Sequence, residues 1–317
     1  METYLGLDLG GTKLLIGEVD SQGKIYNYKR YDSGYFNQHG AFDIIRRSLD
    51  DYIEQMGWYM DKPVAMGVGL IGRVDYEQGI WQQIDPERTC PMPLADQLAE
   101  AYGMPCFIDN DVKSATRAEM IWGHGKVSDN FLYINVGTGI AVGMVINGQQ
   151  IRGSHFNAGE VGHVRVGVQV GVKCPCGRID CVESIASGMG FDRCARLLQS
   201  QYPTRLQIPM VNGERVAVKD IFALYGDDDP LCRVLVDNAA EALANLIMNL
   251  VRMTDPDTVV LGGGVVADGF MLEQIEQYLH PVTMRFVNNG VVLTKLDPQF
   301  VGLLGAAAIA MKMKNEK

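Results

Sequence analysis

Two stretches of the chain share one pattern, and this internal similarity restricts the fold more than any other feature. YLGLDLGGTKLLIGEVD (residues 4–20) and FLYINVGTGIAVGMVING (residues 131–148) each read as a strand, a tight glycine turn and a second strand. Asp8 lies 127 residues before Asn135, and each is followed two residues later by a glycine. Both stretches open a series of alternating helical and strand segments. We therefore predict an α/β fold with a duplicated core, each half starting with a hairpin over a phosphate group.

The segments that follow the hairpins fit such a core. Apolar residues at helical spacing predict helices over 41–57 and 237–253. Apolar runs predict buried strands at 64–72, at 104–111 and within 255–266, where three glycines follow the strand. The small-residue segment GLLGAAAIAMKMK near the end is typical of a helix that packs tightly against a sheet.

Composition narrows the class of protein. Apolar residues make up 47% and charged residues 21% of the chain, and the net charge is −10. This acidic balance disfavours a nucleic-acid partner, which normally requires a basic face. The N-terminal residues METYLGLDLGG lack the basic and long apolar regions of a signal peptide, and no apolar run reaches the length of a membrane span. We expect a cytoplasmic protein without a membrane partner, whose seven cysteines stay reduced.

Glycine turns are the first candidate sites, because backbone N–H groups without a nearby Cβ can approach phosphate oxygens. None of these turns fits the P-loop or the dinucleotide fingerprint, and any single one is explained by the needs of a hairpin. The duplicated pair together with the glycine triplet favours phosphate binding. These three turns comprise Gly10, Gly11, Thr12 and Lys13; Gly137, Thr138 and Gly139; and Gly262, Gly263 and Gly264, whereas a further turn at Gly69–Gly72 is not part of the set.

Carboxylates accompany two of these features. Asp8 lies two residues before the first glycines, where it could hold a hydrated Mg²⁺ against phosphates or simply stabilise the turn. Asn110 and Asp111 follow a buried strand, and a carboxylate at that end of a strand is well placed as a general base. Asp109 is a competitor for this role. The alternative for the pair is an N-cap of the following helix.

A third cluster lies in AGEVGHVRVGVQVGVKCPCGRIDCVES (residues 158–184). Cys174, Cys176 and Cys181, with His163 eleven residues before the first, form the Cys₃His set of a closed tetrahedral Zn²⁺ site. Free thiols or a redox pair are the alternatives. Four protein ligands leave no open position, so this zinc would be structural rather than a catalyst that activates water.

Together these motifs resemble the ROK family of repressors, open reading frames and sugar kinases, over nearly the whole chain. LGLDLGGTK resembles the phosphate motif of that family, and FIDNDVKSATRAE its Asn-Asp strand. AGEVGH and CPCGRIDCVES resemble its ExGH and CxCGxxGCxE motifs, and VVLGGGVV its adenosine-side turn. The resemblance implies an actin-like (hexokinase or ribonuclease H-like) two-domain ATPase fold. We expect one domain over 1–118, to which 302–317 returns, and a second over 119–301.

The resemblance also implies an activity: ATP-dependent phosphorylation of a hexose or N-acylhexosamine, most often at the 6-hydroxyl. Asp111 would be the general base, and ATP would lie on the three glycine turns with Mg²⁺ near Asp8. The other sugar hydroxyls would be held by Asn110, Glu160, His163 and Glu183. His163 would serve twice, with one ring nitrogen on zinc and the other facing the sugar.

The chain departs from the family pattern at four places. Leu70-Ile71-Gly72-Arg73 stands where Pro-Gly-Pro is usual, and QQIDPERTCPMPL (residues 82–94) replaces a segment that helps line the sugar pocket. Lys113 stands where asparagine is usual, and Asp180 where glycine is common. Asp180 needs φ > 0 if it keeps the conformation of the glycine. These changes concern the identity of the substrate more than the type of reaction.

Two other functions compete with a kinase. A non-catalytic sugar-binding protein has the same fold, and the altered segment 82–94 keeps this alternative open. A sugar-responsive repressor is disfavoured, because the phosphate motif starts at residue 4 and leaves no room for a preceding DNA-binding domain. The apolar helical residues 238–253 suit either a homodimer face or a buried core.

Overall fold

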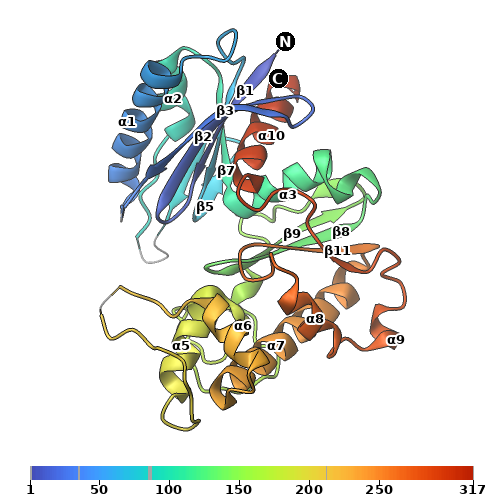
Figure 1. Ribbon diagram of the computed structural model, residues 1–317. Helices are drawn as coiled ribbons and strands as arrows, with labels where there is room; N and C mark the ends of the chain where they lie inside the picture. The colour runs from blue at the N-terminus through green and yellow to red at the C-terminus, as the bar shows by residue number, and fades with distance from the viewer. Residues whose placement is uncertain (1, 35, 85–87, 212, 317) are drawn as a thin grey trace. The chain divides into compact units, whose positions relative to one another are not determined.

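The computed structural model describes residues 2–34, 36–84, 88–211 and 213–316, and the chain forms two compact units (Figure 1). Unit 1 comprises Met1–Lys126, Arg152–Ala158 and Gln299–Lys317, and unit 2 comprises Val127–Ile151 and Gly159–Pro298. The boundary therefore lies a few residues beyond the expected 118. The short segment 152–158 interrupts unit 2 and belongs to unit 1.

Unit 1 is built on a five-stranded sheet with the order β3-β2-β1-β4-β7. β1, β2 and β3 pair in antiparallel fashion, whereas β4 and β7 run parallel to β1. Figure 1 shows α1 and α2 on one side of this sheet and α10 on the other. The strands are β1 (Thr3–Leu9), β2 (Lys13–Asp20), β3 (Ile25–Asp32), β4 (Met66–Leu70) and β7 (Cys106–Asn110), beside the small hairpin of β5 (Arg73–Asp75) and β6 (Ile80–Gln83). The helices are α1 (Gln38–Met56), α2 (Leu94–Tyr102), α3 (Asp111–Trp122), the 3₁₀ turn η1 (His124–Lys126) and α10 (Val301–Glu316).

Alternation along β1 explains how the sheet receives helices on both faces. Leu5, Leu7 and Leu9 are fully buried and belong to a core that also contains Ile45 and Leu49 of α1. Gly6, between the leucines, faces α10, where an added Cβ would lie 2.7 Å from the carbonyl oxygen of Leu303. Backbone approach at this distance requires glycine. The expectation of a small-residue helix packed tightly on a sheet is thus confirmed.

Unit 2 repeats this plan with the strand order β10-β9-β8-β11-β12. β8 and β9 form an antiparallel hairpin, β10 pairs antiparallel to β9, and β11 and β12 are parallel to β8. The order and directions match those of unit 1, which confirms the duplicated core. The strands are β8 (Phe131–Val136), β9 (Ile140–Ile146), β10 (Gln149–Gln150), β11 (Thr258–Gly262) and β12 (Val291–Leu293). The helices are η2 (Val161–His163), α4 (Val182–Ala186), α5 (Gly188–Leu198), α6 (Val218–Gly226), α7 (Pro230–Thr254), α8 (Phe270–Glu276) and α9 (Pro281–Met284).

The long helix α7 forms the centre of the helical layer of unit 2. It begins at an Asp229 N-cap followed by Pro230, a combination that favours helix initiation. By length and composition it could cross a membrane, with a mean hydropathy of 1.3 over 18 residues, but 61% of that window is buried within the fold. Its apolar residues, including Leu243 and Ile247, pack in the core of unit 2.

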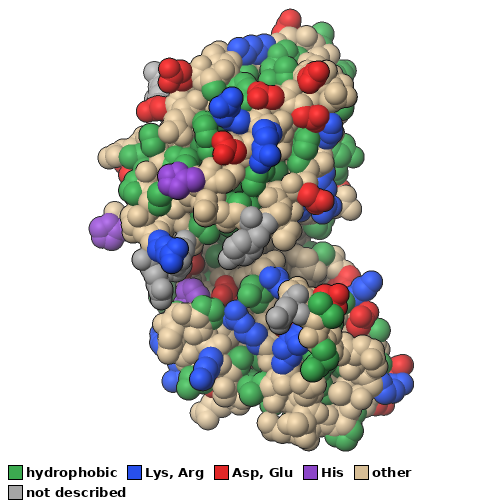
Figure 2. Space-filling model, turned by 90° about the vertical axis from the view of Figure 1, so that its left-hand side faces the viewer, with side chains coloured by type: hydrophobic (Ala, Val, Ile, Leu, Met, Phe, Trp, Pro, Cys, Tyr) green, Lys and Arg blue, Asp and Glu red, His purple; other side chains and the backbone are tan. Residues whose placement is uncertain are grey.

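The surface of unit 1 mixes both signs of charge. On the face shown in Figure 2, acidic and basic side chains are interspersed over this unit. Among the residues coloured there, unit 1 therefore presents no continuous basic surface on this face of the kind that nucleic-acid binding requires.

Candidate active site

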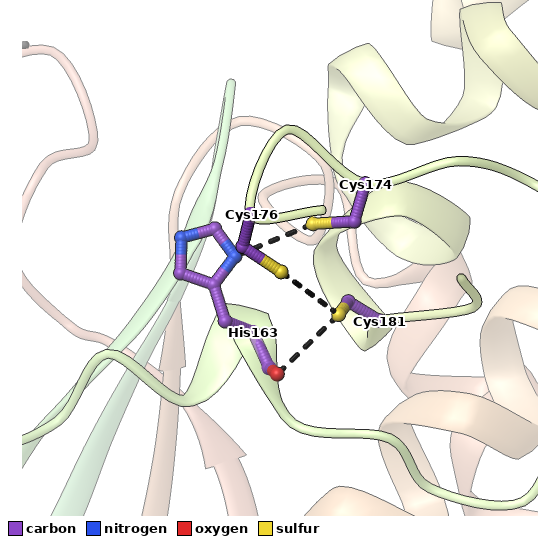
Figure 3. A group of neighbouring side chains, drawn as sticks. All are labelled: His163, Cys174, Cys176 and Cys181. Atoms are coloured by element: carbon purple, nitrogen blue, oxygen red, sulfur yellow. Dashed lines mark hydrogen bonds between the residues drawn. The ribbon is translucent and has the colours of Figure 1, made fainter. Parts of the chain in front are cut away.

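The predicted metal ligands converge in unit 2. The candidate donor atoms of His163, Cys174, Cys176 and Cys181 all lie within 4.8 Å of one another, and Figure 3 shows the three sulfurs grouped beside the imidazole. His163 Nδ1 is 3.4 Å from Cys174 Sγ, and the sulfurs of Cys176 and Cys181 are 3.6 Å apart. Three thiols and one imidazole in this arrangement are the donor set of a structural zinc site.

The thiols differ in their acidity because their surroundings differ. Hydrogen bonds from the backbone and side chain of Arg178 lower the pKa of the exposed Cys176 thiol to about 6, whereas burial raises that of Cys181 to about 12. A bound cation would outweigh the burial of Cys181, because a coordinating thiol loses its proton. The residues present therefore fit Zn²⁺.

Asp180 has a clear role in the loop that carries these cysteines. Its φ is 58°, the left-handed conformation that the replaced glycine would supply, as expected. Its Oδ1 accepts hydrogen bonds from the backbone N–H groups of Val170, Gly171 and Val172 at 3.2, 2.8 and 3.0 Å. The side chain thus satisfies three backbone donors, that of Val172 buried, which a glycine would leave to other partners.

Glu183 connects this loop to the second glycine turn. It lies in the first turn of α4, and its Oε2 accepts a hydrogen bond from the N–H of Ile140 at 2.9 Å. Gly162, which lies beside His163 in η2, is close to the same oxygen, because a Cβ added to this glycine would lie 3.0 Å from it. Glu160 directly precedes η2. The second hairpin, η2 and α4 therefore meet around the Glu183 carboxylate.

The Asn-Asp pair lies at the junction of β7 and α3 in unit 1. Asn110 is the N-cap: its Oδ1 accepts from Val112 N and Lys113 N at 3.1 and 3.2 Å, and its Nδ2 donates to Gly72 O at 3.0 Å. The capping alternative is therefore correct for Asn110. Asp111 is the first residue of α3 and is partly exposed, with Oδ1 2.9 Å from its neighbour's N–H.

Asp109 is excluded as a competing base by its environment. It is buried and forms an ion pair with Arg152, whose Nη1 lies 2.7 Å from each carboxylate oxygen. Both oxygens of this carboxylate are therefore engaged within the fold, and Oδ1 also accepts from the N–H of Asn110. Asp111 is left as the candidate base at this junction.

Asp8 lies beside the first glycine turn and under the start of α10. The surrounding protein raises the pKa of its carboxyl by desolvation, and the positive charge of Lys13 opposes this effect. The turn itself closes with a hydrogen bond from Gly10 N to Lys13 O at 2.9 Å. A hard cation such as Mg²⁺ suits an oxygen donor whose ionisation otherwise costs free energy.

A cavity of about 380 Å³ joins the second and third glycine turns in unit 2. The N–H of Gly188, at the start of α5, donates to Gly137 O at 2.8 Å, so this helix begins at the cavity. Sequence reasoning missed Gly188 and the segment 215–218, which follow no phosphate-binding pattern. The lining residues are Gly137, Thr138, Gly188, Arg215, Val216, Val218, Gly264 and Val265.

The family model of the ROK family matches residues 4–313. This chain belongs to the ROK family. It is similar to the glucokinase of Thermotoga maritima, with 28% identity and 96% of each chain covered. It is also similar to the N-acetyl-D-glucosamine kinase of Citrobacter koseri, with 27% identity over 83% of this chain and 84% of the relative.

Among solved structures, the chain resembles a ROK glucokinase from Streptomyces griseus in complex with glucose and AMPPNP. The TM-score is 0.74, the identity is 26%, and 98% of this chain and 99% of that chain are covered. The actin-like fold with a duplicated core that the sequence predicts is therefore the fold of this ROK protein.

The altered segments of this ROK protein lie around the small β5–β6 hairpin. Trp81 is fully buried, donates through Nε1 to Ile71 O at 3.0 Å and pairs with Met92. This tryptophan is therefore a core residue of unit 1. Residues 85–87, within the segment 82–94 that differs from the family pattern, lie outside the described residues.

Proposed function

We propose that this chain is an ATP-dependent sugar kinase that phosphorylates a hexose or N-acylhexosamine, at the 6-hydroxyl, with Asp111 as general base. The observation that carries the proposal is the β7–α3 junction. There Asp109 is held by Arg152, Asn110 caps the helix, and the partly exposed Asp111 is the first residue of α3. Glucokinase and N-acetyl-D-glucosamine kinase relatives of nearly the same length support the substrate class.

In this proposal, the sugar hydroxyl gives its proton to an Asp111 carboxylate oxygen while the hydroxyl oxygen bonds to the γ-phosphorus and ADP leaves. Asp111 lies in the first turn of α3, at the positive end of the helix dipole. Phosphoryl transfer depends mainly on alignment and charge neutralisation.

The nucleotide would lie on the three glycine turns. The cavity that joins Gly137–Thr138 to Gly264 is also lined by Arg215, whose positive charge suits phosphate groups. Asp8 and the first turn, residues 10–13, would bind phosphate oxygens as well. Mg²⁺ held by Asp8 would neutralise phosphate charge when bound.

The sugar would be held by Asn110, Glu160, His163 and Glu183. Figure 3 shows one imidazole nitrogen of His163 directed at the sulfurs and the other directed away from them. The nitrogen near Cys174 is Nδ1, so we assign Nδ1 to zinc and Nε2 to a sugar hydroxyl. Bound zinc would supply rigidity to this wall, with no open position for chemistry. A homodimer and a cytoplasmic location stay predictions.

The test is a coupled ADP-release screen of the zinc-loaded protein with glucose, mannose, fructose, allose, N-acetylglucosamine and N-acetylmannosamine. We expect turnover with at least one of them, and loss of turnover but retention of sugar binding in Asp111→Asn. Asp96→Asn, on the exposed surface of α2, is the matched control and should keep wild-type rates. Sugar binding without turnover in the wild type would favour the non-catalytic alternative instead.

A further inference from the structure

The segment 152–158 is attached to unit 1 by three kinds of contact. Arg152 pairs with Asp109 of β7, Phe156 packs edge-on against Tyr76 with ring centroids 5.3 Å apart, and Ala158 O accepts a hydrogen bond from Lys113 Nζ. This explains why a stretch between β10 and η2 belongs to unit 1 rather than to unit 2. The segment ends two residues before Glu160.

The Arg152–Asp109 pair is largely buried. The two side chains are only 12% and 3% exposed, and the guanidinium lies 4.4 Å above the ring centroid of Tyr76. A planar guanidinium can bind a carboxylate through its edge while its face lies on an aromatic ring. Removing either partner would leave the other charge buried and unpaired.

The same carboxylate also holds the backbone that leads to the candidate base. Asp109 Oδ1 accepts hydrogen bonds from Arg152 Nη1 at 2.7 Å and from the N–H of Asn110 at 2.8 Å. Asn110 in turn caps α3, where Asp111 is the first residue. The orientation of Asp109, which Arg152 sets, therefore determines the conformation of the turn on which Asp111 lies.

We infer that Arg152 is a positioning residue for the kinase reaction. It acts through Asp109 on the Asn110–Asp111 turn, and along the chain it fixes the segment that precedes Glu160. Lys113, in the first turn of α3, attaches the same segment a second time through its hydrogen bond to Ala158 O. This contact gives a role to the lysine that stands at this position. This inference rests on the proposed function, since Asp111 and Glu160 are its targets.

The experiment compares full-length wild-type protein, Arg152→Met, Arg152→Lys and a matched control, Lys29→Met. Lys29 forms an ion pair with Asp51 in the same unit, but both side chains are well exposed at 34% and 42%. We expect Arg152→Met to lower kcat by about 10²-fold, the scale of a misaligned reacting group, while the KM for ATP stays within about twofold. Arg152→Lys keeps a cation beside Asp109 and should restore part of the rate. Lys29→Met should match the wild type.

Hydrogen exchange of the peptide 106–113 gives a readout that needs no turnover. We expect faster exchange in Arg152→Met than in the wild type and the control, because the turn at Asn110 loses its fixed acceptor. If Arg152→Met does not fold, the inference is tested by the kcat of Arg152→Lys and by the hydrogen exchange of the peptide 106–113 in that variant. A folded Arg152→Met protein with wild-type kcat, or with unchanged exchange of this peptide, would overturn the inference. Turnover of no sugar by the wild type would count against the proposed function alone, since the exchange measurement still applies.

Discussion

Gly302 and Asp8 lie so close together that a Cβ at position 302 would collide with the Asp8 carboxylate. A Cβ on Gly302 would be 2.7 Å from Asp8 Oδ1 and closer still to Oδ2. The first turn of α10 therefore packs directly on the carboxylate that would hold Mg²⁺. Residues separated by most of the chain are thus joined at one wall of the candidate phosphate site.

Gly302→Ala should therefore displace the Asp8 carboxylate. We expect the Mg²⁺ concentration for half-maximal activity to rise and kcat to fall by about 10- to 100-fold, because charge neutralisation depends on the position of this group. Steady-state kinetics over a magnesium series measures both. Gly226→Ala at the end of α6, where an added Cβ meets nothing within 4 Å, is the control and should leave both values unchanged. Normal magnesium dependence in Gly302→Ala would remove Asp8 from the cation site.

We expect the ionised Asp8 carboxylate to lower the stability of the fold and yet to be required for activity. Burial raises the pKa of its carboxyl in the folded state, so its ionised form opposes folding once the pH rises above the unfolded value. This free-energy cost has its full size above the raised pKa of the folded state. It decreases as the pH falls below that pKa and is gone below the pKa of the unfolded state. Asp8→Asn should therefore raise the Tm at pH 7 without Mg²⁺, and should lose the increase at about pH 3, where the wild-type carboxyl is protonated. Calorimetry at the two pH values checks this. The same variant should lose kinase activity.

The sequence predicted more of the fold than of the contacts within the site. The hairpin repeat at Asp8 and Asn135 led to the duplicated core, because strand alternation and glycine turns are local signals. The metal cluster was also predictable, since its cysteines are close in sequence. In contrast, the pair of Asp109 with Arg152 spans 43 residues and depends on how the segment 152–158 packs. No local sequence pattern predicts such a contact.

The role of Asn110 illustrates a different limit. Its sequence context allowed both a cap and a sugar ligand, and the structure shows the cap. A side-chain amide has two donors and an acceptor, so the cap alone does not decide what else it binds. Arg215 was missed for a simpler reason: it follows no phosphate-binding motif and reaches the cavity only through the fold of unit 2.

Zinc should be needed for the sugar-binding wall. Metal analysis is expected to find about one Zn²⁺ per chain, as four protein ligands predict. Cys176→Ser should lose the metal and bind sugar at least about tenfold more weakly, and because Cys176 is exposed, the change leaves no cavity in the core. Cys90→Ser, outside the cluster and only partly buried, is the control. Unchanged sugar affinity in a metal-free Cys176→Ser protein would separate the cluster from the site.

Asp180 should stabilise the cysteine loop through its three backbone hydrogen bonds. Asp180→Gly restores the conformationally favourable residue but removes the acceptor, and we expect a net loss of about 1–3 kcal/mol in the free energy of unfolding. Asp180→Asn keeps one side-chain oxygen and should lose less. Urea unfolding of both variants with zinc present measures the difference. A glycine variant more stable than the wild type would mean that the cost of the positive φ outweighs the hydrogen bonds.

Arg215 should contribute to nucleotide affinity rather than to the chemical step. It lines the cavity that joins the second and third glycine turns, and none of the proposed sugar ligands lines that cavity. Arg215→Ala should raise the KM for ATP by about tenfold or more, the usual effect of losing a charge-assisted contact, while the sugar KM stays unchanged. Arg205→Ala is the matched control, because that arginine pairs with Asp227 on the exposed surface of the same unit. A larger effect on the sugar KM than on the ATP KM would reassign this cavity.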